Sequence, residues 1–184
     1  MDTEGVIMSN LSQGLVQIYT GNGKGKTTAA FGLALRAVGH GFRVYIIQFM
    51  KGNGGYGELD GVKRLGPECQ LEHFGGPGWV HKGEHLEENV EEANKAFLRA
   101  EEIILSGNWD IVILDEIINA IWFELIPESK VLELINRKPP HIELILTGRN
   151  ASQALIERAD LVTEMVAKKH PFEKGIMSRQ GIEY

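Results

Sequence analysis

The run 20–28 (TGNGKGKTT) combines glycine, lysine and threonine in a pattern suited to binding an anion. Glycines let successive backbone N–H groups turn towards one point and form a nest for phosphate oxygens. A helix that begins directly after such a loop adds the positive end of its dipole at the same point. The residues expected to contact phosphate are Gly21, Asn22, Gly23, Lys24, Gly25, Lys26, Thr27 and Thr28.

Two side chains of this loop point to ATP with its magnesium ion as the ligand. Lys26 can bring a positive charge to the phosphates, and Thr27 can offer a hydroxyl to Mg²⁺. The loop resembles a Walker A motif, G-x4-G-K-[ST], but Thr20 stands where that motif has its first glycine. Counted from Gly21 the loop is one residue short, so we expect the phosphates to lie differently from those in an ordinary ATPase. The alternative, a glycine-rich turn without a ligand, leaves the two lysines without a role.

A second candidate element is the apolar run 111–114 (IVIL), which is followed by Asp115 and Glu116. It resembles a Walker B strand, whose terminal carboxylates bind Mg²⁺ directly or through water. On its own it could equally be a strand that ends in surface acids. Together with the phosphate loop it favours a metal site formed by Thr27, Glu116 and Asp115. Arg149, after a later strand, could reach the nucleotide or cap a neighbouring helix, and the sequence leaves both open.

Alternating strands and helices must position these groups. Short apolar runs predict strands, and longer stretches with apolar residues at i, i+4 and i+7 predict helices. The expected strands are 15–19, 43–49, 70–74, 110–114, 141–146 and 160–166. The expected helices are 27–38, 84–105, 117–125, 128–137 and 151–159. This order predicts an α/β domain with a mostly parallel sheet flanked by helices, in which ligands bind at the carboxyl ends of the strands.

Composition sets limits on the class of protein. The chain has 184 residues, 43% hydrophobic and 24% charged, which fits one globular domain, 1–184, with 1–13 expected to be flexible. A formal net charge of −6 argues against a dedicated nucleic-acid-binding protein. The single cysteine excludes an intramolecular disulfide framework. Without a bilayer-length apolar run or a signal-peptide pattern, we expect a cytoplasmic protein that does not enter a membrane.

The middle segment 74–81 (FGGPGWVH) is rich in glycine and carries two large aromatic side chains, Phe74 and Trp79. A mobile backbone with flat apolar side chains is typical of a lid that becomes ordered when a ligand binds. The alternative is a surface loop whose aromatic residues anchor it to the core. Both interpretations stay open from the sequence.

Together these motifs resemble one family, the P-loop corrinoid adenosyltransferases, over nearly the whole chain. A phosphate loop alone would indicate only a superfamily, whereas the short loop with AAFG, the QFMKG strand end and the GIEY terminus are more specific. The matching segments are 20–32 (TGNGKGKTTAAFG), 36–41 (RAVGHG), 48–52 (QFMKG), 114–116 (LDE), 147–149 (TGR), 159–165 (ADLVTEM), 169–172 (KHPF) and 180–184 (QGIEY). The resemblance implies a P-loop NTPase-like (RecA-like) fold.

The resemblance also implies a reaction. Co(I) of a corrinoid, either cobalamin or cobyrinic acid a,c-diamide, attacks the 5′ carbon of the ATP ribose, and triphosphate leaves. By this reading the backbone of 21–26 and the charge of Lys26 hold the triphosphate, Thr27 and Glu116 coordinate Mg²⁺, and Asp115 lies beside them. Lys26, Thr27 and Glu116 are the residues expected to carry catalysis.

In this family an aromatic-lined cavity displaces the lower axial ligand of the corrinoid. Trp79 matches one of the family's aromatic positions there, whereas the other falls on Pro77, with Phe74 close by. The resemblance further implies a flavoprotein-type reductant that supplies Co(I), and a homodimer. The alternatives are a P-loop NTPase or kinase acting at the γ-phosphate, or a binding module that delivers coenzyme without turnover.

Overall fold

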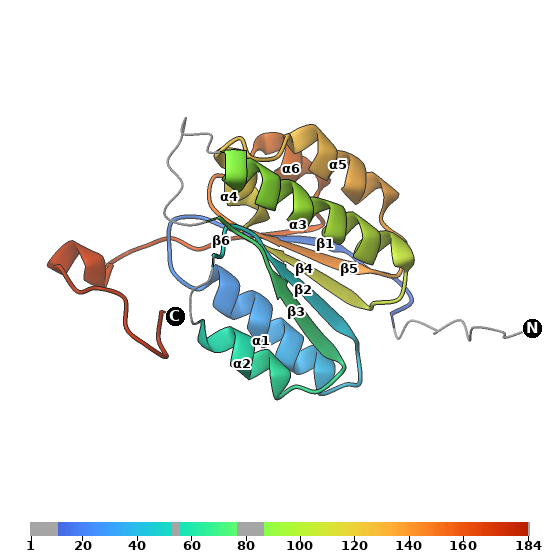
Figure 1. The fold of residues 1–184 in the computed structure, drawn as a ribbon, viewed down its shortest axis with the longest axis horizontal. Helices are drawn as coiled ribbons and strands as arrows, with labels where there is room; N and C mark the ends of the chain where they lie inside the picture. Colours follow the sequence, from blue (N-terminus) through green and yellow to red (C-terminus); the bar gives the residue numbers. More distant parts are fainter. Residues whose placement is uncertain (1–10, 53–55, 77–86, 184) are drawn as a thin grey trace, which may run out of the picture.

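The structure is a computed structural model, and it describes residues 11–52, 56–76 and 87–183. Strands and helices alternate along these residues, as the sequence predicts (Figure 1). The elements are β1 (Val16–Thr20), α1 (Lys26–Val38), β2 (Val44–Gln48), α2 (Gly57–Lys63), β3 (Cys69–His73), α3 (Glu87–Ser106), β4 (Ile111–Asp115), α4 (Ile117–Trp122), α5 (Glu128–Arg137), β5 (Glu143–Thr147), α6 (Gln153–Arg158), β6 (Leu161–Glu164) and the 3₁₀ turn η1 (Pro171–Lys174).

The six strands form one sheet in the order β3-β2-β4-β5-β1-β6, and every neighbouring pair is parallel. Helices α1 and α2 cover one face, and α3, α4, α5 and α6 cover the other (Figure 1). This confirms the predicted α/β fold with a parallel sheet flanked by helices. Because all strands point the same way, the loops that follow β1, β2, β4 and β5 open at one edge of the sheet, where ligands bind in such folds.

The core lies on both faces of the sheet. Strands β2 and β4 are buried along their whole length, as expected for apolar runs in a parallel sheet covered on both sides. On one face they pack with α3 to α6 in a large cluster, and on the other with α1 in a smaller one. Helix α1 presents Ala30, Ala34 and Ala37 to the sheet. These small side chains let the helix lie close to the strands. The close packing of α1 in turn positions the loop between β1 and α1.

The predicted elements agree with the structure to within a few residues, and only α2 and the short 3₁₀ turn η1 were not predicted. Helix α2 has two glycines and little apolar periodicity, so nothing in its local sequence predicted it. Tertiary packing holds it, since Val62 is buried and α2 lies against β3. The predicted start of α3 at 84–86 lies outside the described residues, as do 1–10 of the expected flexible segment.

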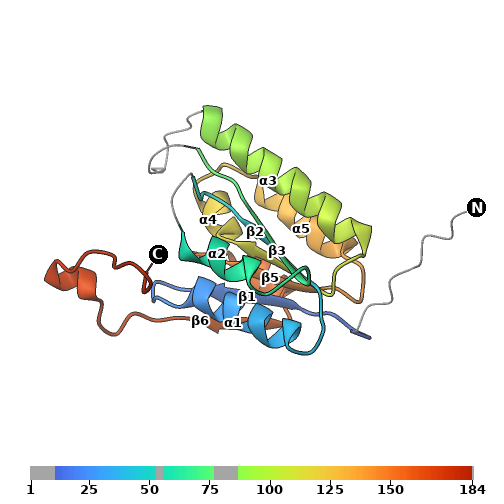
Figure 2. The same cartoon turned by 60° about the horizontal axis from the view of Figure 1, so that its bottom comes forward.

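Strand β6 forms the edge of the sheet, and all four of its residues are exposed. Beyond it the chain extends away from the domain through η1, and its end returns to the same side as the start of α1 (Figure 2). Among the described residues no helix is both long enough and apolar enough to cross a membrane.

Candidate functional site

The phosphate loop lies where β1 ends and α1 begins. Gly25 precedes the helix with φ of 121°, and Gly21 has φ of 95°. Residues with a Cβ rarely adopt these positive angles, so the turn requires glycine at both positions. The expected strand–loop–helix arrangement of a phosphate site is therefore present, with the N-terminus of a 13-residue helix at its base.

A second reason for the glycines is the segment that follows β6. The Gly23 N–H donates a 2.6 Å hydrogen bond to the carbonyl oxygen of Met165. A Cβ added at Gly21 or Gly23 would lie 2.5 or 2.7 Å from that same oxygen. The loop is thus packed against the chain beyond the edge strand, an interaction that the glycine pattern did not reveal.

Lys26 folds back over this loop. Its Nζ donates hydrogen bonds of 2.8 Å to the Gly21 carbonyl and 2.9 Å to the Gly23 carbonyl, and only 7% of the residue is exposed. Burial lowers the pKa of the ammonium group, and Arg149 acts in the same direction, whereas Glu116 and Asp115 oppose them. Burial disfavours the charged form of Lys26. An anionic ligand bound at this position would favour that charged form.

Asp115 is fully buried and lies at the centre of a hydrogen-bond network. Its Oδ1 accepts from the hydroxyls of Thr27 at 2.9 Å and Thr147 at 2.7 Å. Its Oδ2 accepts from Nε2 of Gln48 at 3.0 Å. These contacts join β2, β4, β5 and the start of α1. Because Thr27 gives its proton to Asp115, the oxygen lone pairs of its hydroxyl remain available to a cation.

Glu116 follows directly and has a left-handed backbone, with φ of 65°. Its N–H donates to the Thr147 hydroxyl at 2.9 Å, and its carboxylate accepts a hydrogen bond from the Asn119 amide. Burial raises the pKa of this carboxyl, as does the nearby Asp115, while Lys51, Lys26 and Arg149 act in the opposite direction. A half-buried carboxylate whose charge is favoured by three nearby cations fits a site for a polyanionic ligand and a metal.

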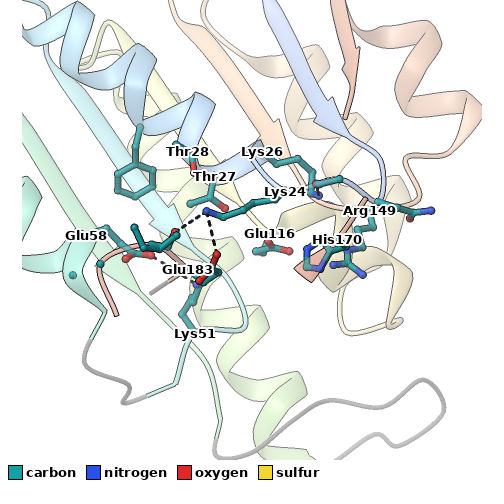
Figure 3. Close-up of a pocket in the computed structure, with 17 residues that line it drawn as sticks. Lys24, Lys26, Thr27, Thr28, Lys51, Glu58, Glu116, Arg149, His170 and Glu183 are labelled. Atoms are coloured by element: carbon teal, nitrogen blue, oxygen red, sulfur yellow. Dashed lines mark hydrogen bonds and ion pairs between the residues drawn. The ribbon is translucent and has the colours of Figure 1, made fainter. Parts of the chain in front are cut away.

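These residues line a cavity of about 620 Å³ at the carboxyl edge of the sheet (Figure 3). Its lining includes most of the predicted site: Asn22, Gly23, Lys24, Gly25, Lys26, Thr27, Thr28, Glu116 and Arg149. Gly21 and Asp115 are buried behind this surface. The Arg149 side chain is exposed at the cavity, while its backbone N–H donates to Asn119 Oδ1 at 2.6 Å.

Four parts of the cavity wall were not among the predicted site residues. Phe31 comes from α1, and Glu58 from α2. Lys51 follows β2, and its Nζ lies 3.8 Å from Glu58 Oε1 and 4.3 Å from the centre of the Tyr56 ring. The fourth part is the chain end, His170 and 181–183. The matching KHPF and GIEY segments were the only sequence signal for it.

The chain end contacts the phosphate loop through Lys24. Nζ of Lys24 donates a 2.7 Å hydrogen bond to the Ile182 carbonyl and lies 3.8 Å from Glu183 Oε1 (Figure 3). Hydrogen bonds from Arg179 hold the pKa of the Glu183 carboxyl at about 2, so this carboxylate is charged at neutral pH. The chain end therefore contacts the domain at this point.

Of the two aromatic residues predicted to contact the corrinoid, the structure describes only Phe74. Phe74 is half-buried and packs against the larger core cluster. Its backbone extends the β2–β3 pairing, since its N–H donates to the Gln48 carbonyl at 2.9 Å. Trp79 lies outside the described residues. The structure therefore leaves both corrinoid contacts as predictions.

The donors at the cavity fit a magnesium ion. No group of three His, Cys, Asp or Glu side chains in 11–52, 56–76 and 87–183 is placed to hold a metal alone. Magnesium prefers oxygen ligands and often takes several of them from a substrate's phosphates. The Thr27 hydroxyl and the Glu116 carboxylate supply protein oxygens beside the phosphate loop. A metal bound jointly by these two groups and a triphosphate fits this arrangement.

A parallel sheet with a glycine-lysine loop after its first strand and an acidic pair after the fourth defines an α/β protein of the P-loop class. Comparison with known proteins gives the family. A family model described as ATP:corrinoid adenosyltransferase BtuR/CobO/CobP matches residues 12–184. The chain belongs to this family.

Curated relatives agree with the family model. A protein of Sinorhizobium sp. named corrinoid adenosyltransferase is 40% identical over 94% of this chain and 81% of its own length. The corrinoid adenosyltransferase of Escherichia coli K12 is 34% identical, over 94% of this chain and 86% of its own. The corrinoid adenosyltransferase CobA of Salmonella typhimurium is 33% identical, over 97% and 90%. These relatives are matched over most of their length, so the similarity is not confined to a nucleotide-binding module.

Proposed function

We propose that this chain transfers the 5′-deoxyadenosyl group of ATP to Co(I) of a corrinoid, with Mg²⁺ bound and triphosphate released, in the synthesis or salvage of adenosylcobalamin. Co(I) forms a bond to C5′, the C5′–O bond breaks, and its electron pair leaves with the triphosphate. Cobalt is formally oxidised to Co(III) in this step. The observation that carries the proposal is that the phosphate loop, Lys26 and Glu116 line one cavity in a chain of this family.

The phosphate loop holds the leaving group. The charge of Lys26 and the backbone N–H groups of 21–26, other than the Gly23 N–H that donates to Met165, stabilise the negative charge that grows on the triphosphate as the C5′–O bond breaks. Lys26 bonds to the loop's own carbonyls in this structure, so it must turn outward by a bond rotation to meet the phosphates. Three further side chains at the cavity surface can contact other oxygens of the triphosphate, namely those of Lys24, Thr28 and Arg149.

The metal site is formed by Thr27 and Glu116, with Asp115 orienting the Thr27 hydroxyl through their 2.9 Å hydrogen bond. When bound, Mg²⁺ supplies further positive charge to the leaving triphosphate. No side chain need act as nucleophile or general base, because the attacking atom belongs to the corrinoid. The protein's part is to bind, to orient and to exclude water.

By resemblance to the family, Phe74 and Trp79 are proposed to supply the aromatic surface that the corrinoid contacts. Displacing the lower axial ligand makes reduction to Co(I) feasible, and a flavoprotein-type reductant would provide the electron. Pro77 replaces one aromatic residue of the family, so Trp79 and Phe74 would share that task. We further propose a cytoplasmic homodimer as the working form.

An anaerobic assay tests the activity. Protein, Mg-ATP, a corrinoid and a strong chemical reductant are mixed, and the visible spectrum is followed for formation of the Co–C bond. We expect the adenosylcorrinoid spectrum to appear only when ATP and protein are both present. Folded protein that produces no such change with cobalamin or cobyrinic acid a,c-diamide would contradict the proposal.

A further inference from the structure

We infer that Thr147 is a positioning residue that holds both acidic residues of the proposed metal site through one hydroxyl group. Thr147 is the last residue of β5 and is fully buried, so it contacts no ligand itself. The inference rests on the proposed function, because it concerns the same magnesium site. It adds Thr147 to the predicted site residues, which are those of the phosphate loop, the acidic pair and Arg149.

The first contact of this hydroxyl fixes Asp115. Oγ1 of Thr147 donates to Asp115 Oδ1 at 2.7 Å, the same oxygen that accepts from Thr27 at 2.9 Å. Gln48 holds the other carboxylate oxygen at 3.0 Å. With donors on both oxygens, the carboxylate cannot rotate without breaking a buried hydrogen bond. The direction of the Thr27 hydroxyl, a proposed magnesium ligand, follows from that fixed carboxylate.

The second contact fixes Glu116. The regular pairing of β4 with β5 ends at Leu114 and Leu146. Just beyond the end of β4, the Glu116 N–H donates to the side-chain oxygen Thr147 Oγ1 at 2.9 Å. At the residue where β4 turns into α4, the Thr147 hydroxyl oxygen thus accepts the hydrogen bond that a backbone carbonyl accepts within a sheet.

The conformation of Glu116 makes this contact necessary. Its φ of 65° is unfavourable for a residue with a side chain and persists only where surrounding interactions hold it. The Thr147 hydroxyl and the contact of the Glu116 carboxylate with Asn119 are two such interactions. Loss of the hydroxyl would free the turn that directs this carboxylate to the cavity. A single oxygen that accepts from Glu116 and donates to Asp115 therefore couples the two acids.

The experiment measures metal binding, not turnover. Without a reduced corrinoid ATP is not consumed, so Mn²⁺ binding to the protein–ATP complex can be followed at equilibrium by electron paramagnetic resonance. Thr147→Val keeps the shape of the side chain and removes the hydroxyl, and we expect Mn²⁺ affinity to fall about tenfold or more, as for other groups that orient metal ligands. Thr147→Ser keeps the hydroxyl and should bind within about threefold of wild type, because such an orienting effect needs only that oxygen. ATP affinity measured with EDTA should be unchanged in both.

The matched control is Thr163→Val, the same substitution on the exposed edge strand β6. It should leave Mn²⁺ affinity unaltered. Should Thr147→Val not fold, Thr147→Cys replaces it, since a thiol of similar size is a weak hydrogen-bonding group, and the same loss is expected.

Wild-type Mn²⁺ affinity in folded Thr147→Val or Thr147→Cys would overturn the inference and leave the proposed function standing. An equal loss in Thr147→Ser would also overturn it, because the methyl group and not the hydroxyl would then matter. Absence of Mn²⁺ binding in the wild-type ATP complex would remove the metal site itself, and the inference with it.

Discussion

The hydroxyl of Thr27 donates a 2.9 Å hydrogen bond to the buried carboxylate of Asp115, across a separation of 88 residues in the chain. This contact joins the end of the phosphate loop to the acidic end of β4. The proposed magnesium site would need both segments, because the loop provides the hydroxyl and the strand fixes its direction. The proposed chemistry depends on this geometry at the carboxyl edge of the sheet.

Replacing Lys26 by alanine should strongly reduce turnover. The ammonium group is the buried positive charge of the loop, and losing one such contact with developing charge typically lowers kcat by about 10²- to 10³-fold. The measurement is the anaerobic rate of Co–C bond formation, with the melting temperature as a check on folding. Lys63→Ala, in α2 at an exposed pair with Asp60, is the control and should keep full activity. A Lys26→Ala enzyme as active as wild type would mean that the loop has another role.

Two glycine substitutions in neighbouring segments should have opposite effects on stability. Gly23→Ala would place a Cβ 2.7 Å from the Met165 carbonyl oxygen and should destabilise the fold by about 1–3 kcal/mol. Gly32→Ala lies in α1 with nothing within 4 Å of the added carbon, and it should stabilise the helix by about 0.5–1 kcal/mol. Urea denaturation measures both. Equal stability of the two variants would show that the 164–166 segment does not pack on the loop.

The single cysteine predicts a decline in stability at alkaline pH. Burial raises the pKa of the Cys69 thiol from 9.0 to about 11. Between these values the unfolded chain loses the thiol proton while the folded chain keeps it, so the free energy of unfolding falls as pH rises, by up to about 2–3 kcal/mol. The difference in stability between wild type and Cys69→Ala, followed from neutral pH to about pH 11, isolates this contribution. A difference that stays constant over that range would contradict the burial of the thiol.

Trp79→Ala should weaken use of the corrinoid without weakening ATP binding. Trp79 is assigned to the corrinoid by resemblance alone, so its removal should lower kcat/KM for the corrinoid by at least about tenfold, a loss of the size expected when a buried aromatic contact is removed. The ATP dissociation constant should not change, because the phosphate loop is intact. Calorimetric titration with Mg-ATP and the anaerobic assay measure the two quantities. Weakened ATP binding with normal use of the corrinoid would reverse the assignment.

The sheet and the loop could be predicted from sequence because their signals are local. Apolar runs such as Ile111–Asp115 form central strands wherever both faces are covered, and the glycine-lysine run has one suitable position, between a strand and a helix. The same reasoning placed Asp115 and Glu116 at the strand end. For these residues, their spacing along the chain was sufficient to predict their position in the fold.

Long-range contacts were not predictable in this way. Nothing near Thr147 indicates that its hydroxyl joins two acids, because the partners come from a different strand. Helix α2 depends on packing against β3, and the glycines at 21 and 23 are required partly by Met165. In each case the interaction is formed between segments far apart in the sequence, so no local pattern records it.

The identity of the phosphate product distinguishes adenosyl transfer from cleavage at the γ-phosphate. After a single anaerobic reaction with ATP, Mg²⁺ and reduced corrinoid, phosphorus-31 nuclear magnetic resonance distinguishes inorganic triphosphate from ADP and phosphate. Triphosphate is expected in equal amount to the adenosylcorrinoid formed. ADP and phosphate in place of triphosphate would contradict it, and would assign this cavity to cleavage at the γ-phosphate.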